Sequence, residues 1–143
     1  MKEQDLFYLL ALQRIEGVGD IMAKKLLTHL GSAEAVFNSK ASELAGIEGV
    51  GTVLLKNLKD KSVFKKANQE LEFIKANEIN VVYFQDEEYP DRLKHCIDGP
   101  LLLFSSGTIN LKNRKIISIV GTRQITSYGT EFCRKLIEDL APL

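Results

Sequence analysis

The stretch IEGVG occurs twice in the chain, as Ile15–Gly19 and again as Ile47–Gly51. Aligned outward from these residues, LQRIEGVGDIMAKKLL (12–27) and LAGIEGVGTVLLKNLK (44–59) share one pattern, offset by 32 positions. In each copy, x-Gly-apolar-Gly separates two runs whose apolar residues recur at helical spacing. Glycines between such runs predict a tight turn that joins two helices. The repeat therefore predicts two helical hairpins that bury their apolar faces against each other.

The two glycines of each copy have different expected uses. The first, Gly17 or Gly49, lies in the turn, where a glycine permits a positive φ. The second, Gly19 or Gly51, brings bare backbone to the N-terminus of the next helix. The N–H groups there, together with the helix dipole, can hold a phosphate. This pattern resembles the helix-hairpin-helix motif of DNA-binding proteins that lack sequence specificity.

The copies differ beside the expected phosphate position. Asp20 follows the first copy, where we expect it to act as the N-cap and to repel a phosphate. Thr52, also an expected cap, follows the second copy and precedes a run of lysines, so the second hairpin is the better candidate. The alternative is that the glycines only pack helices closely and the lysines form a solvated face. The candidate hairpin contacts are Gly17, Gly19, Lys24, Gly49, Gly51, Thr52 and Lys56.

The pattern changes from helical to mixed after about residue 77. Three β-branched or apolar runs predict strands, over 79–84, 101–104 and 115–121. A helix over 127–140 follows the third run, which makes half of a βαβ unit. We expect an all-helical domain over 1–77 and an α/β domain over 78–143. Since a parallel sheet needs a further strand, we also expect the sequence to be part of a longer protein.

The stretch IISIVGTRQITSYG (116–129) carries a second phosphate-binding pattern. A strand is expected to end at Gly121, so the turn after it presents N–H groups at a helix N-terminus. Arg123 offers a planar fork of donors for phosphate oxygens, and Thr122 offers a hydroxyl. The stretch contains neither G-x-G-x-x-G nor a Walker lysine, which excludes those nucleotide fingerprints. The alternative interpretation is an N-capped helix after a strand.

Longer motifs add a family resemblance. DEEYPDRLKHCIDGPLLLFSSG (86–107) followed by ISIVGTRQITSYG (117–129) resembles the signature of the DNA processing protein A (DprA/Smf) family. The shared elements are Tyr-Pro with a leucine three residues on, D-x-P-x-x-L-F-x-x-G, and IVGTR-x-x-T-x-YG. The order also matches, with a helical helix-hairpin-helix (SAM-like) domain before a Rossmann-like domain. The sequence ends before the later glycine-rich segment that completes the family's phosphate groove.

The resemblance implies a function as well as a fold. It implies a protein that binds single-stranded DNA, protects it and loads a RecA-type recombinase onto it during natural transformation, as a homodimer when intact. Tyr89 and Pro90 are expected to shape the fold. The positions that fall on the family's DNA-phosphate contacts are Gly121, Thr122, Arg123, Gln124, Thr126 and Ser127.

Composition excludes several other classes. The formal net charge is zero, so phosphate binding has to come from local geometry rather than from a global basic field. Cys96 and Cys133 lack metal-ligand spacing and are expected to be reduced thiols of a cytoplasmic protein without a membrane segment. No catalytic constellation, metal site or cofactor motif is legible, and we expect a binding protein rather than an enzyme. Two alternatives stay open: a Rossmann-like enzyme of the nucleotide phosphoribohydrolase type, and a helical protein-interaction module without DNA contact.

Overall fold

The computed structural model describes residues 1–107, 117 and 119–140. The chain divides into two compact units, Met1–Lys112 and Asn113–Leu143. None of the helices in the described residues is long and apolar enough to cross a membrane. The protein is mostly helical, with one small antiparallel sheet in the first unit.

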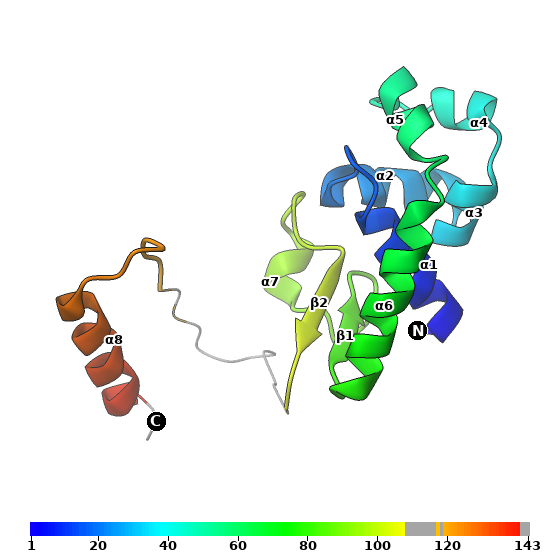
Figure 1. Ribbon diagram of the computed structural model, residues 1–143. Helices are drawn as coiled ribbons and strands as arrows, with labels where there is room; N and C mark the ends of the chain where they lie inside the picture. Colours follow the sequence, from blue (N-terminus) through cyan, green and yellow to red (C-terminus); the bar gives the residue numbers. More distant parts are fainter. Residues whose placement is uncertain (108–116, 118, 141–143) are drawn as a thin grey trace. The chain divides into compact units, whose positions relative to one another are not determined.

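Helices account for the first half of the chain. They are α1 (Glu3–Gln13), α2 (Asp20–Leu30), α3 (Ala33–Asn38), α4 (Ala41–Ala45), α5 (Thr52–Asn57) and α6 (Ser62–Ala76). Figure 1 shows α1 beside α6, with α2 and α3 packed on α1 and with α4 and α5 together at one end. The packing of α6 follows from its sequence, because its buried residues Val63, Ala67, Leu71 and Ile74 recur three and four positions apart.

Two strands and a short helix complete the first unit. Strand β1 (Asn80–Tyr83) pairs antiparallel with β2 (Leu102–Ser105), and α7 (Asp91–Lys94) lies between them in sequence. Both strands lie within one residue of the ranges predicted for them. Leu101 and Leu102 are buried in the same hydrophobic core as the helices, so the sheet packs as part of the helical unit. The domain division into 1–77 and 78–143 stays a prediction.

The second unit is dominated by α8 (Ser127–Leu140), which covers the range predicted for it. Thr126 caps this helix, since its Oγ1 accepts a hydrogen bond from the Gly129 N–H at 3.1 Å. Of the third predicted strand, residues 115, 116 and 118 lie outside the described residues. Residues 117 and 119–121 are exposed and belong to no strand. A strand requires a hydrogen-bonded neighbour, and none of the described residues pairs with this segment.

The two IEGVG turns contact each other's second helix. Gly17 and Gly49 have φ angles of 90° and 91°, as predicted from the turn. A Cβ at Gly17 would lie 3.7 Å from Leu54 of α5, and a Cβ at Gly49 would lie 2.8 Å from Met22 of α2. Met22 and Leu54 occupy equivalent positions of the two copies, so the contacts are reciprocal.

Hydrogen bonds repeat this reciprocity. The side-chain amide of Asn57 donates to the backbone carbonyl of Glu16 at 3.0 Å, and the ammonium of Lys25 donates to the carbonyl of Glu48 at 2.9 Å. Asn57 and Lys25 are also equivalent in the repeat. The glutamate carbonyl of each turn is therefore bound by a side chain of the other copy, as in a two-fold symmetric interface made within one chain.

Gly49→Ala tests this arrangement. We expect the free energy of unfolding to fall by about 1–3 kcal/mol, because a non-glycine residue in the left-handed region costs roughly 1–2 kcal/mol and the new methyl group displaces Met22. Gly17→Ala has only the backbone cost and should lose about 1–2 kcal/mol. Urea unfolding followed by circular dichroism measures both.

Gly46→Ala is the matched control for these two variants, since Gly46 has a φ of −75°. It should change the free energy of unfolding by less than about 1 kcal/mol. A Gly49→Ala protein as stable as the Gly46→Ala protein would contradict the reciprocal-turn arrangement.

Candidate nucleic-acid interface

The second glycine of each hairpin is the N-cap of the following helix. Gly19 and Gly51 have φ angles of −89° and −92°, which other residues adopt freely, and no side-chain hydrogen bond caps either helix. A Cβ on either glycine would meet nothing within 4 Å. Neither backbone conformation nor internal packing therefore requires a glycine here. The bare N-caps leave room for an external group to approach the backbone.

The predicted caps Asp20 and Thr52 are wrong, because each is the first residue of its helix rather than the N-cap. In the first hairpin, the Asp20 carboxylate does not cap α2 because it binds a different backbone N–H. Asp20 Oδ1 accepts a hydrogen bond from the backbone N–H of Leu101 at 2.8 Å. Sequence spacing gives no signal for this contact, since the two residues are 81 positions apart.

Lys24 adds a second contact from α2 to the same segment. Its ammonium donates to the carbonyl of Gly99 at 2.5 Å and lies 5.3 Å from the ring centroid of Phe84. The equivalent residues of the second hairpin, Thr52 and Lys56, are exposed. The first hairpin thus uses its polar residues for internal docking, while the second presents them to solvent.

The segment that receives these contacts contains the Tyr-Pro and Asp-Gly-Pro motifs. Tyr89 is buried, and its hydroxyl donates to the carbonyl of Pro100 at 2.7 Å. Burial, followed by the nearby charges of Asp20 and Cys96, raises the pKa of Tyr89 above its ordinary value. A Cβ at Gly99 would lie 2.8 Å from the carbonyl oxygen of Leu93, so this position has no room for a side chain. These contacts support the fold-shaping role expected for Tyr89.

The GTR turn precedes α8 in the second unit. The six predicted phosphate contacts, Gly121, Thr122, Arg123, Gln124, Thr126 and Ser127, are all exposed and lie in one continuous segment. The Thr122 hydroxyl donates to the Gln124 carbonyl at 2.6 Å, which folds the turn back on itself.

Arg123 and Arg134 differ in their surroundings. Arg134 is ion-paired with Glu131 and Glu138, at 2.6 and 2.9 Å. Among the described residues, no carboxylate pairs with Arg123. A planar cationic fork beside the N-terminus of a helix suits a phosphate. Contact between these residues and DNA stays a prediction, as it does for the hairpin residues.

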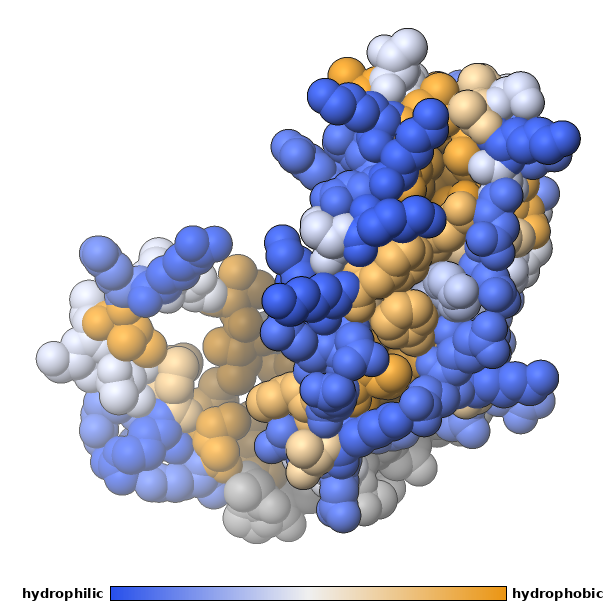
Figure 2. All heavy atoms as spheres, turned by 45° about the vertical axis from the view of Figure 1, so that its right-hand side comes forward, coloured by the Kyte–Doolittle hydropathy of each residue, from blue (hydrophilic) through white to orange (hydrophobic). Residues whose placement is uncertain are grey.

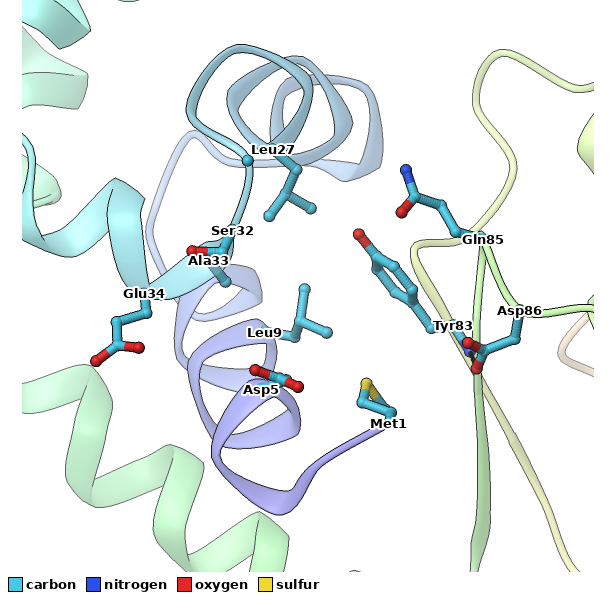
Figure 3. Close-up of a pocket in the computed structure, with 11 residues that line it drawn as sticks. Met1, Asp5, Leu9, Leu27, Ser32, Ala33, Glu34, Tyr83, Gln85 and Asp86 are labelled. Atoms are coloured by element: carbon cyan, nitrogen blue, oxygen red, sulfur yellow. Dashed lines mark hydrogen bonds between the residues drawn. The ribbon is translucent and has the colours of Figure 1, made fainter.

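A pocket of about 470 Å³ in the first unit has a different character. Figure 3 shows Leu9 and Leu27 on one side and the ring of Tyr83 directed into the space, with the carboxylate of Asp5 at its edge. Burial and then the charge of Asp86 raise the pKa of Tyr83. Glu34 also lines the pocket. Its three carboxylates make it unsuited to a phosphate, and sequence reasoning did not find it.

Metal binding has no support in the part of the chain that the structure describes. No group of three His, Cys, Asp or Glu side chains there could hold a metal ion. Cys96 and Cys133 are free thiols.

Asp20→Ala tests the docking of α2. We expect a loss of about 1–3 kcal/mol in the free energy of unfolding, because the Leu101 N–H is left without its acceptor. Asp20→Asn retains a side-chain oxygen and should lose less. Thr52→Ala, at the equivalent exposed position, should change stability by less than about 0.5 kcal/mol. Equal urea midpoints for Asp20→Ala and Thr52→Ala would contradict the docking role.

Comparison with known proteins finds one family model and several relatives that resemble parts of this sequence. Residues 80–142 match the family model described as DNA recombination-mediator protein A. The chain is 24% identical over 144 aligned residues to Protein Smf of Synechocystis sp., which covers 98% of the chain and 36% of that relative. It is 39% identical over 64 residues to DNA processing protein DprA of Bacillus subtilis, which covers 43% of the chain and 21% of that relative.

No solved structure matches the chain at a significant level. The chain spans little more than a third of the length of the Synechocystis relative. The family match begins at β1, includes the segment docked by Asp20 and Lys24, and continues through the GTR turn and α8. From β1 onward the chain is therefore similar to proteins of the DprA/Smf family, over a match that spans less than half of its residues.

Proposed function

We propose that this protein binds single-stranded DNA through the GTR turn. The observation that supports this most directly is the exposed cluster of Thr122, Arg123 and Gln124 before α8, within the segment that matches the DNA recombination-mediator family. Arg123 would hold phosphate oxygens with its planar fork. The N–H groups at the start of α8 would add a partial positive charge.

The groups at the GTR turn determine how DNA binding should depend on salt and on sequence. The described residues around the turn offer donors to phosphates but no aromatic ring placed to stack on bases, apart from Tyr128 in the first turn of α8. Binding should then depend steeply on salt and little on sequence. A neutral net charge also means that affinity comes from a few local contacts.

The second hairpin is a further contact in this proposal. Gly51 leaves the start of α5 bare, and Lys56 lies exposed one turn later. The first hairpin is less available, because Asp20 and Lys24 contact the segment before β2. This interpretation retains the helix-hairpin-helix assignment for the N-terminal helices and the Rossmann-like assignment for the segment from β1 onward.

The family relationship extends the proposal to the whole protein. We propose a cytoplasmic DNA-processing protein of natural transformation that protects incoming single strands and delivers them to a RecA-type recombinase, as a homodimer. The names of the matching family, a DNA recombination mediator, and of the Bacillus relative, a DNA processing protein, support this proposal. We further propose that it acts by binding rather than by catalysis and needs no cofactor.

Arg123→Ala is the first test. Fluorescence anisotropy with a labelled oligo(dT), over a salt series, should show affinity reduced about 10- to 100-fold, as for loss of one charge-assisted hydrogen bond. The slope of log K against log salt should become shallower by about 1. The matched control is Arg134→Ala, which removes an ion-paired arginine of α8 and should bind as wild type. Equal losses in both variants would show a non-specific charge effect, and no binding by wild type would reject the proposal.

Gly51→Ser separates DNA contact from folding. A serine at an N-cap should leave the free energy of unfolding unchanged or raise it by no more than about 0.5 kcal/mol, because its hydroxyl caps the helix. The same side chain would obstruct a phosphate at the bare backbone, so affinity for oligo(dT) should fall. Gly19→Ser, at the internally docked hairpin, should affect binding less. If Gly51→Ser binds DNA as wild type does, the second hairpin does not contact the strand.

A further inference from the structure

A hollow of about 100 Å³ opens where α3, α4 and α5 meet the connection from α5 to α6. Phe37, Leu55 and Leu58 contribute apolar lining, while Lys59 and Lys61 contribute their side chains to the same hollow. Figure 2 shows that hydrophobic atoms are open in a band on one face of the molecule, bordered by hydrophilic side chains. An apolar recess with cationic edges differs from the carboxylate-lined pocket beside Tyr83.

The ring at this hollow belongs to an aromatic cluster. The Phe37 and Phe64 rings lie 4.9 Å apart, and Phe64 stacks on Phe7 at 5.7 Å with an angle of 19° between the planes. Both Phe37 and Phe64 are only partly buried. The Lys61 ammonium lies 5.3 Å from the Phe64 ring centroid. The Lys61 ammonium therefore lies close to the aromatic rings of this cluster.

The lysines at this surface are without carboxylate partners among the described residues. Lys59, Lys61 and Lys65 are exposed and form no ion pair there, whereas Lys25, Lys75 and Lys94 each pair with a carboxylate. Lys61 is the N-cap residue of α6, and Lys65 lies four positions later in the first turn of that helix. The intervening acid is Asp60, whose carboxylate accepts hydrogen bonds from the N–H and the hydroxyl of Ser62, both at 2.8 Å.

We propose that this hollow is a base-binding subsite for single-stranded DNA. One unstacked base would enter beside Phe37, and the neighbouring phosphates would contact Lys59, Lys61 and Lys65. The inference rests on the single-stranded DNA binding proposed above and adds a contact outside the GTR turn. Its place on the chain supports it, because Lys56 of the second hairpin is three positions before Lys59.

The combination of groups favours a single strand over other ligands. A duplex keeps its bases stacked and cannot insert one, whereas a single strand presents the face of each base for stacking. Cations beside aromatic rings are the arrangement by which proteins track a strand and hold its bases. An acidic peptide would use the lysines but would show no requirement for bases, which makes it a distinguishable outcome.

The test uses the intact protein with two labelled oligonucleotides of equal length, oligo(dT) and its abasic counterpart. Phe37→Leu keeps apolar volume and removes the aromatic face. It should weaken oligo(dT) binding on the order of 10-fold and leave abasic binding unchanged. Phe73→Leu is the matched control, since Phe73 of α6 is 60% exposed and does not line the hollow.

The lysines are tested by substituting Lys59, Lys61 and Lys65 together with glutamine. This variant should lose affinity for both oligonucleotides and reduce the salt slope by about 2–3. Lys75→Gln, which removes an ion-paired lysine of α6, should retain the wild-type slope. Circular dichroism of each variant checks that the helices are intact.

The outcomes separate this inference from the proposed function. Loss of binding in Arg123→Ala with wild-type binding in the Phe37 and lysine variants would overturn the subsite alone. If the lysine variant loses affinity but Phe37→Leu binds oligo(dT) as wild type does, or weakens both oligonucleotides equally, the base-binding subsite is also overturned, in favour of a purely electrostatic surface. Failure of wild type to bind either oligonucleotide would reject both proposals.

Discussion

The helical unit depends on the reciprocal contact between two glycine turns. Each turn needs a positive φ, which only glycine adopts without strain, and each turn lies against the second helix of the other hairpin. Met22 and Leu54 supply the apolar side of these contacts, and Lys25 and Asn57 bind the turn carbonyls. The repeated pentapeptide is explained by this mutual requirement, before any ligand is considered.

The two hairpins differ at two equivalent positions. Asp20 and Lys24 of the first hairpin contact the segment before β2, whereas their equivalents Thr52 and Lys56 face solvent. The same scaffold thus joins the helices to the β segment on one side and offers a polar surface on the other. Tyr89, Pro100 and Gly99 complete the docked side by fixing the loop that α2 contacts.

Local patterns predicted most of the elements. The three-and-four spacing in α6, the Gly turns and the apolar runs at β1 and β2 all follow from side chains close in sequence, and the structure confirms them. The caps Asp20 and Thr52 were wrong, because a long-range partner at Leu101 decides the use of Asp20 and because the glycine before each is the N-cap. The hollow beside Phe37 was also not predictable, since its lining comes from three helices whose packing no local pattern specifies. For the GTR turn, the motif correctly placed the exposed residues in one segment before a helix, but solvent exposure alone does not identify a ligand.

The docking of α2 onto a segment about 80 residues later has a consequence for synthesis on the ribosome. The helices all come from the first part of the chain, before the β segment. N-terminal units generally fold first during translation. Asp20 and Lys24 would then be held in place on a folded surface when Gly99 and Leu101 emerge. The β segment would then fold against the first hairpin. Misfolding of that hairpin would therefore also disturb the packing of β1 and β2.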